Sequence, residues 1–386
     1  MNNPFEKYLP WFILREIPLL GNRLCKKLIH EFKTPKKILQ TPKNQLKLID
    51  KISAKVIDNI LNYKKFQDGA KKELELVLNK NIKIVTITDP LYPALLKEIG
   101  DPPPFLTYLG QLDNTSPCIS VVGSRNATSY GLSTSENFSH NLAQKGFQIV
   151  SGLARGIDSM AHKGALRANK KTIAVMGSGL NKIYPRENRH LFNDIAVKGT
   201  VFSEFKVNTD PFPQNFPIRN RIIAGLSCGS IIVEAAQRSG SLITARLAAE
   251  YNREVFAVPG SIKSKKSQGT HALLKQGAKL VENEMDILDE LQHFVHTRNS
   301  DPKDNDQKNN DQNASLQKQS LNKNRDIIKQ SKIFKFLEPY PLHIDSLIEK
   351  SKLDSSKVTS QLLDLELEGC VTRHQGDYYS ISEEYL

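Results

Sequence analysis

The sequence predicts an α/β protein built on a doubly wound, mostly parallel sheet, with an all-helical region before it and a winged helix after it. Between residues 81 and 292, short apolar runs alternate with longer amphipathic segments, as is typical of βαβ units with buried strands. The first 80 residues lack this alternation, and a polar stretch separates the last 60 from the core. The runs are ISVVG, QIVSG, TIAVMGSG, TVFSEF, SIIVEAA and REVFAVPG.

Residues 1–80 are predicted to form short helices. An apolar stripe with i, i+4, i+8 spacing starts at Leu20 and reaches Leu28. The preceding residues 17–21 (IPLLG) resemble the hairpin of a helix-hairpin-helix module, in which backbone N–H groups approach a phosphate. The second candidate hairpin, residues 51–53 (KIS), lacks the glycine. A helical bundle with a solvated lysine-rich face and a DNA-contacting module therefore both stay open.

Composition divides the rest of the chain. Residues 81–292 form the predicted sheet domain. The stretch from His296 to Arg325 is rich in Asn, Gln, Asp and Lys and has no aromatic residue. A segment this polar cannot bury enough surface to offset its ordering entropy. We therefore predict a disordered linker over residues 293–326.

Residues 327–386 are predicted to form a winged helix. Three short helical patterns (IIKQSKIFKFL, HIDSLIEKS and SSKVTSQLLDLELEG) precede a hairpin that turns at residues 375–377. The presumed recognition helix carries one lysine and three acidic residues, so a DNA groove is an electrostatically poor partner for it. We expect this domain to contact protein or a second copy of the chain. The residues concerned are Lys357, Asp364, Glu366 and Glu368.

The charge balance favours a polyanionic partner. The 386 residues carry a formal net charge of +13, with +8 in residues 1–110, +7 in residues 111–292 and −2 in residues 293–386. Such an excess is compatible with nucleic acid or an anionic membrane surface. The C-terminal quarter does not share the positive charge.

The cysteines and the apolar runs indicate a cytoplasmic protein. No run approaches the roughly 20 apolar residues that span a bilayer, and the N-terminus has no signal-peptide pattern. We expect no membrane partner. The cysteines are far apart and form no C-x-x-C pair, which predicts reduced thiols without zinc; they are Cys25, Cys118, Cys228 and Cys370.

Glycine, serine and arginine recur in the loops after the predicted strands, without a nucleophile and its base. A glycine lets the backbone approach an anion, a serine supplies a hydroxyl, and an arginine supplies a bidentate phosphate contact. Tight turns also require glycine, but the recurrence at successive strand ends favours anion binding. The candidates are Gly123, Ser124 and Arg125 in the first loop, Gly152, Arg155 and Gly156 in the second, Arg186 and Asn188 in the third, and Ser239, Gly240 and Ser241 in the fifth.

Aromatic and basic residues are interleaved between the fourth and fifth strands, ahead of the predicted helix IIAGLS. Phe212 and Phe216 suit stacking on single-stranded bases, and Arg219, Asn220 and Arg221 suit contacts to the backbone. Taken singly, either phenylalanine is better explained as a core residue beneath a proline-rich loop.

Familiar nucleotide motifs are absent from the sequence. It has no G-x-x-x-x-G-K-[ST] phosphate loop, and Gly177-Ser178-Gly179 lacks the third glycine of a dinucleotide fingerprint. We expect no cofactor and no metal. Asp158 and His162 are four residues apart, and we interpret Asp158 as a helix N-cap with His162 on the same helix face, not as an acid–base pair.

Together these motifs resemble the DNA-processing protein A family (DprA, also called Smf). The resemblance covers about residues 81–285. A similar lead-in, DPLYPALLKEIGDPPPFLTYLG, precedes the matching stretches. These are ISVVGSRNATSYG, IVSGLARGIDSMAH, TIAVMGSGLNKIYPREN, FPIRNRIIAGLS, IIVEAAQRSGSLITARLAAEYNREVFAVPG and GTHALLKQGAKLV.

The resemblance implies an extended Rossmann-like core that binds single-stranded DNA and forms a homodimer. It also implies a protein that protects incoming strands during natural transformation and helps to load the RecA recombinase, without being an enzyme. The N-terminal helices resemble the SAM-like or helix-hairpin-helix module of many members, and the C-terminal unit resembles their winged helix. By motif match, the DNA pocket includes Gly123, Ser124, Arg125 and Arg186, to which we add Arg155, Arg219, Arg221 and the Ser239–Ser241 anion nest.

Two other function classes are compatible with parts of the sequence. Phosphoribohydrolases of similar fold bind a nucleotide phosphate in a glycine-rich loop, but their P-G-G-x-G-T-x-x-E motif is absent and SGSLITARLAAE stands in its place. Glu234 would be available as their acid, although it suits a structural cap equally well. A general duplex-binding protein is compatible with the basic N-terminal region alone.

Overall fold

The computed structural model describes residues 3–296, 331, 333–337, 342–367, 370–374 and 376–381. They fall into two compact units, which separate near residue 300. The first unit holds the N-terminal helices and the large sheet, and the second is the C-terminal domain.

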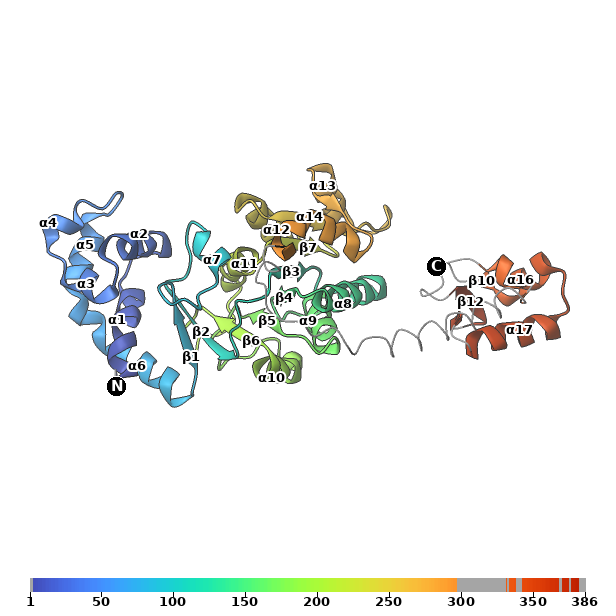
Figure 1. The fold of residues 1–386 in the computed structure, drawn as a ribbon, viewed down its shortest axis with the longest axis horizontal. Helices are drawn as coiled ribbons and strands as arrows, with labels where there is room; N and C mark the ends of the chain where they lie inside the picture. The colour runs from blue at the N-terminus through green and yellow to red at the C-terminus, as the bar shows by residue number, and fades with distance from the viewer. Residues whose placement is uncertain are drawn as a thin grey trace, which may run out of the picture. The chain divides into compact units, whose positions relative to one another are not determined.

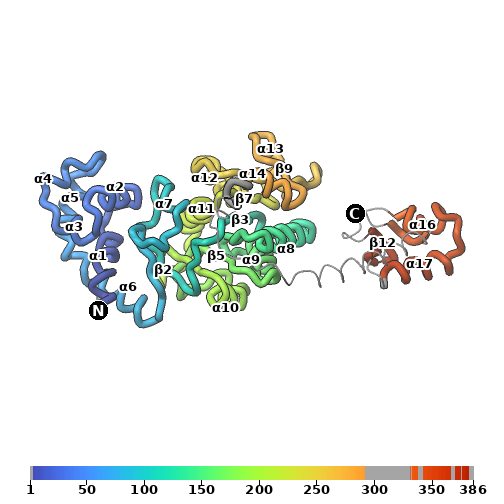
Figure 2. The backbone as a smooth tube through the Cα atoms, in the orientation of Figure 1, coloured from blue at the N-terminus to red at the C-terminus, as the bar shows by residue number. Residues whose placement is uncertain are grey.

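The chain begins with a group of short helices, drawn in blue beside strands β1 and β2 in Figures 1 and 2. Residues 17–21 connect the first two helices, and Gly21 is the N-cap of the second. In residues 51–53, Lys51 adopts a φ of 62°, so this turn forms without a glycine. The predicted all-helical region is confirmed. Its helices are α1 (Pro4–Glu16), α2 (Asn22–Phe32), α3 (Pro35–Gln40), α4 (Lys43–Leu46), α5 (Ala54–Leu61) and α6 (Gln67–Asn79).

A nine-stranded sheet follows in the order β1-β2-β6-β5-β4-β3-β7-β8-β9. The predicted apolar runs form β3 to β8, which pair in parallel. The antiparallel pair β1–β2 extends the sheet beyond β6. Strand β1 precedes the lead-in of residues 89–110 and β2 lies at its end, and the sequence predicted neither strand. The strands are β1 (Lys83–Thr86), β2 (Phe105–Gly110), β3 (Cys118–Val122), β4 (Gln148–Ser151), β5 (Thr172–Val175), β6 (Thr200–Ser203), β7 (Gly229–Ile232), β8 (Glu254–Ala257) and β9 (Lys279–Leu280).

The strand order has a switch point at β3. After β3 the chain builds β4, β5 and β6 on one side, then returns to build β7, β8 and β9 on the other. In open parallel sheets, ligands bind outside the carboxyl ends of the strands at such a switch point. The loops after β3 and β7 therefore border the expected crevice.

Helices cover both faces of the sheet (Figure 1). One face carries α8 (Ser129–Gln144), α9 (Ile157–Arg167), α10 (Arg189–Lys198) and α14 (Glu284–His296). The other carries α11 (Asn215–Leu226) and α12 (Ser241–Glu250), while α7 (Ala94–Glu98) packs on α11 and α13 (Gln268–Lys275) on β8. Helix α14 takes in residues 293–296 of the predicted linker; residues 297–326 lie outside the described part.

The C-terminal unit has the elements of the predicted winged helix. Strand β10 (Leu342–His343) and β11 (Val371–His374) flank β12 (Tyr378–Ile381) in a small antiparallel sheet, packed with α16 (Ile344–Ser351) and α17 (Ser355–Leu367). Of the first predicted helix, the described residues show a 3₁₀ turn at Phe334–Phe336. Lys357 and Asp364 are exposed on α17, whereas Glu368 lies outside the described residues.

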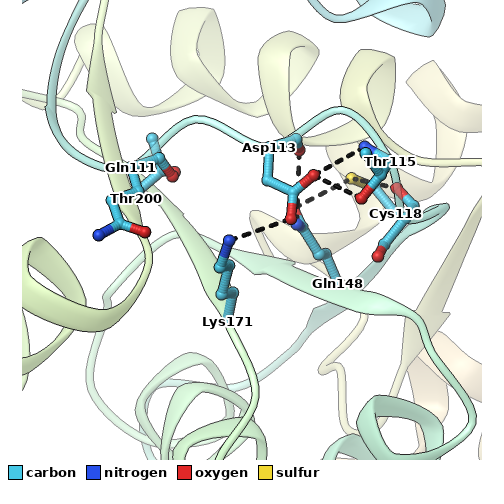
Figure 3. A network of polar contacts seen from close by, with 8 residues as sticks. Gln111, Asp113, Thr115, Cys118, Gln148, Lys171 and Thr200 are labelled. Atoms are coloured by element: carbon cyan, nitrogen blue, oxygen red, sulfur yellow. Dashed lines mark hydrogen bonds and ion pairs between the residues drawn. The ribbon is translucent and has the colours of Figure 1, made fainter.

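A network of hydrogen bonds joins the amino ends of β3, β4 and β5, at the edge of the sheet opposite the switch point (Figure 3). Asp113 accepts hydrogen bonds from the backbone N–H and the hydroxyl of Thr115, at 2.9 and 2.5 Å, and contacts the Lys171 ammonium at 3.1 Å. The Gln148 amide donates to the Asp113 carbonyl at 3.4 Å. The Thr115 hydroxyl, helped by the Lys171 ammonium, lowers the pKa of Asp113 from 3.8 to about 2.

This network predicts a pH-dependent stability. Because the folded pKa lies below the unfolded value, the stabilising effect of the carboxylate is present above about pH 4 and is lost as the pH falls towards 2. The shift corresponds to about 2 kcal/mol at most. We expect Asp113→Asn to lower the free energy of unfolding at pH 7, and the difference from the wild type to shrink as the pH falls and to disappear below about pH 2. Denaturant titrations would measure it, with Asp194→Asn on an exposed face of α10 as the control.

Candidate nucleic-acid site

A cavity of about 250 Å³ lies at the switch point. A second cavity, of about 180 Å³, adjoins it on the side of the loop after β5. Arg125, Ala154 and Phe216 line both, so Phe216 stands between two halves of one groove. The first cavity brings together the predicted residues Gly123, Ser124, Arg125, Arg219, Asn220, Ser239, Gly240 and Ser241, and the second adds Gly152 and Arg155.

The glycines of these loops make room for other parts of the protein. A Cβ atom on Gly152 would collide with the Arg219 guanidinium, and one on Gly177 would lie 2.7 Å from the Phe216 ring. Gly156 has a φ of 72° and faces the Ser124 carbonyl closely. These glycines are therefore needed for packing whether or not an anion approaches them, and their role in admitting an anion stays a prediction. They allow three loops and one arginine to pack together.

Arg219 is a buried clamp within the protein. Its Nη1 donates to the carbonyls of Gly152 and Val175 at 2.6 and 2.5 Å, and only 4% of the residue is exposed. Burial lowers its pKa to about 10. The guanidinium thereby joins the ends of β4 and β5 to α11 and forms part of the cavity floor, instead of reaching outwards.

The structure does not bring Arg221 to the groove. Its Nη2 contacts both carboxylate oxygens of Glu204, and its Nη1 donates to the Asp101 carbonyl. The sequence placed Arg219 and Arg221 in a loop, but α11 begins at Asn215 and includes both. Residues two apart on a helix project to nearly opposite sides, so the two arginines could not share one site.

Arg125 is the exposed arginine at the centre of the groove. Its guanidinium lies 5.0 Å from the centroid of the Phe216 ring, a cation–π arrangement. Within the part of the chain that the structure describes, it has neither a hydrogen-bonded nor an ion-paired partner. It is thus free to contact an anionic ligand.

The other predicted polar residues are differently engaged. Arg155 is exposed but paired with Glu187. Arg186 is exposed on a 3₁₀ turn (Arg186–Asn188) and lines neither cavity. The Asn188 amide donates to the Leu153 carbonyl at 2.8 Å, so Asn188 braces the loop after β4 instead of facing the groove.

The residues before α12 form a polar rim. The hydroxyls of Ser239 and Ser241 are 2.8 Å apart, and the Asn220 amide donates to the Gly240 carbonyl at 3.2 Å. The amino end of α12 borders the cavity at Ser241 and Thr244, where the helix dipole favours negative charge. An anion nest at Ser239–Ser241 stays a prediction.

Phe212 and Phe216 are not core residues beneath the proline-rich loop. Phe212 is 50% exposed. Phe216 is half-buried; the Tyr184 ring centroid lies 5.7 Å from its own, and the Arg125 guanidinium lies 5.0 Å from it. Tyr184 is exposed and was not among the predicted site residues. Its position two residues before the predicted Arg186 was visible in the sequence, but its contact with Phe216 depends on the fold.

The candidate acids and the buried histidine have structural partners. Asp158 is not the N-cap of α9, because Gly156 holds that place; its carboxylate accepts from the Gly152 N–H at 3.0 Å. His162 contacts the Thr172 hydroxyl at 2.8 Å, and burial lowers its pKa to about 3. Glu234 accepts from the backbone N–H and hydroxyl of Thr128, which is the N-cap residue of α8, and so holds the start of that helix.

The described residues contain neither a metal-ligand cluster nor a membrane-spanning helix. No three His, Cys, Asp or Glu side chains there are grouped as metal ligands. None of the described helices combines the length and apolar character needed to cross a bilayer.

Comparisons with known proteins identify the family and the fold. Residues 83–292 match the family model of DNA recombination-mediator protein A, and residues 327–377 match that of the DprA winged helix domain. The protein Smf of Synechocystis is 35% identical, with 98% of this chain and 99% of that protein covered. The X-ray structure of DNA processing protein A from Streptococcus pneumoniae matches with a TM-score of 0.65 at 36% identity, over 73% of this chain and 97% of that one.

A second solved structure bears on the ligand. It is DNA processing protein A from Helicobacter pylori, described by its single-stranded DNA binding mode. It matches with a TM-score of 0.51 at 31% identity, and the match covers 55% of this chain and 98% of that one.

Proposed function

The chain belongs to the DNA recombination-mediator protein A family (DprA/Smf), and on that premise we propose that it binds single-stranded DNA in the groove at the switch point. The observation that carries the proposal is the contact of the exposed Arg125 with the Phe216 ring at 5.0 Å, together with the lack of an ion-pair partner for Arg125 among the described residues. Bases stack on aromatic rings while arginine contacts the phosphates, which is the chemistry of single-strand binding. The Helicobacter pylori structure supports this ligand class.

Within the groove, we assign Arg125 and Ser124 to a phosphate and Phe216 with Tyr184 to the bases. Ser239, Gly240 and Ser241 form a second anion contact at the start of α12, and Arg155 and Arg186 lie at the outer edge. Gly123, Gly152 and Gly156 shape the loops, while Arg219, Asn220 and Asn188 act by holding them.

In the cell, this binding would serve recombination. Family membership supports a cytoplasmic mediator that protects incoming single strands, acts as a homodimer and helps to load RecA during natural transformation. The same support favours a binding protein over an enzyme, and the structural engagement of Asp158, His162 and Glu234 is consistent with that. We further propose the domain limits 1–80, 81–292, 293–326 and 327–386, with the second domain extended to His296 because α14 ends there.

The test compares ligands on one preparation. We expect a fluorescent single-stranded oligonucleotide to bind much more tightly than the duplex of the same sequence, with an affinity that falls as salt rises. The alternative phosphoribohydrolase would instead release a base from a nucleoside monophosphate. Base release without tight strand binding would reject the proposal, and equal affinity for duplex would favour the general duplex binder.

The ion pair at the edge of the groove gives a directional prediction. Glu187 neutralises Arg155, and both side chains are about half exposed or more, so the pair itself contributes little to stability. We expect Glu187→Gln to free Arg155 for a phosphate and to tighten single-strand binding about threefold at low salt, with a salt slope steeper by about 0.7. The gain should vanish in Glu187→Gln/Arg155→Ala. Glu136→Gln, which breaks the remote pair with Arg167, is the matched control.

A further inference from the structure

The N-terminal helices are tied to one short segment of the core. The segment, residues 204–210, follows β6 and leads towards α11. Its Val207 N–H donates to the Glu73 carboxylate of α6 at 2.8 Å. Lys206 contacts Glu16 of α1 at 2.6 Å, a second tie to the same segment.

A third helix joins the same segment. The Asn22 amide, at the start of α2, donates to the Glu204 carboxylate at 2.6 Å. Three helices thus converge on the beginning of residues 204–210. The Glu73 contact is the most enclosed of these ties, since its side chain is 11% exposed and it accepts from a backbone group that cannot swing away.

The held segment in turn supports the loop after β5. The Gly179 N–H donates to the Thr209 carbonyl at 2.9 Å, and the Asn181 N–H to the Val207 carbonyl at 3.0 Å. A Cβ atom on Gly179 would collide with the carbonyls of residues 206 and 207. These contacts bind the two stretches closely, so a displacement of one moves the other.

Both stretches end at the aromatic walls of the groove. Residues 177–182 run into Tyr184, and residues 204–210 run into α11 with Phe216. The two rings meet at 5.7 Å. We propose that Glu73 is a positioning residue for single-strand binding: it fixes residues 204–210 from the N-terminal helices and so sets the separation of Tyr184 and Phe216. This rests on the proposed function of the groove.

The test uses the full chain and substitutions in α6. We expect Glu73→Leu to weaken binding of a single-stranded oligonucleotide about fivefold, because a hydrogen bond to a carboxylate is lost and the segment loosens. The salt slope should not change, because no phosphate contact is removed. Glu73→Gln keeps an acceptor for Val207 and should bind within about twofold of the wild type. Glu75→Leu, exposed on the same helix, should leave the affinity unchanged.

Hydrogen exchange separates positioning from general instability. Amides of residues 204–210 should exchange faster in Glu73→Leu and at the wild-type rate in Glu75→Leu. Val77→Ala, which opens the buried side of α6, should lower stability without lowering affinity. An equal loss of affinity in Val77→Ala, or full affinity in Glu73→Leu, would overturn the proposal.

A second variant and a separate criterion distinguish failure of the positioning role from failure of the proposed function. If Glu73→Leu does not fold, Asn22→Ala removes the tie to Glu204 and should weaken binding in the same direction. If the wild type itself does not bind single strands, the proposed function fails, while unchanged exchange of residues 204–210 in Glu73→Leu would reject the positioning role separately.

Discussion

Replacing Arg125 by alanine should weaken single-strand binding about 10- to 100-fold, whatever the base sequence. Arg125 is exposed, stacks on Phe216 and has no ion partner among the described residues, so its full charge is available to a phosphate. A hydrogen bond to a charged group is worth about 1.5–3 kcal/mol, and each factor of ten in affinity corresponds to about 1.4 kcal/mol. One lost phosphate contact should also reduce the salt slope by about 0.7.

The control for this variant must remove the same charge elsewhere. Arg246 lies exposed on α12 and pairs with Glu250, outside both halves of the groove. We expect Arg246→Ala to retain the affinity and slope of the wild type. Fluorescence anisotropy at several salt concentrations measures both quantities. An Arg125→Ala protein with wild-type affinity and slope would show that the strand does not run past this residue.

Replacing Arg219 by methionine should lower the free energy of unfolding by about 3 kcal/mol. The change keeps a long apolar stem but removes the guanidinium that satisfies the carbonyls of Gly152 and Val175. It also leaves the buried Asp158 without the positive charge that favours its ionised form. Removing one partner from a buried polar cluster is costly because the other groups stay desolvated.

Chemical denaturation followed by circular dichroism measures this effect. Arg246→Met, on the surface of α12, should change stability by less than about 0.5 kcal/mol. Gly152→Ala offers an independent check, because its Cβ would collide with the Arg219 guanidinium. In the double variant Arg219→Met/Gly152→Ala that collision is gone. The double variant should therefore lose less free energy of unfolding than the two single variants lose together. Strict additivity, or a loss below about 1 kcal/mol for Arg219→Met, would contradict the clamp.

The local patterns identified the framework of the site. Strands β3 to β8 were predicted because a strand buried on both faces needs a continuous apolar run, which is a property of neighbouring residues. Parallel pairing then places the carboxyl ends of these strands at one edge, so the loops with Ser124, Arg125 and Ser239 were expected together. The cavity at the switch point brings these residues together.

The use of each side chain was decided by contacts between distant segments. Arg125 and Arg155 look alike in sequence, yet Arg155 meets Glu187 across two loops while Arg125 meets Phe216, 91 positions away. Arg219 and Arg221 were separated by where α11 begins. Gly152 serves an arginine 67 positions later.

The sequence by itself therefore determined the element types, the parallel core and the set of candidate loops, because hydrophobic periodicity and turn chemistry are local. Only the tertiary structure decided which arginine is free, which is a clamp and which is turned away. Charge pairing and burial depend on the packing of residues far apart in the chain. The same holds for the ties from Glu73, Glu16 and Asn22 to residues 204–210, because no local pattern records a contact between segments more than 130 positions apart.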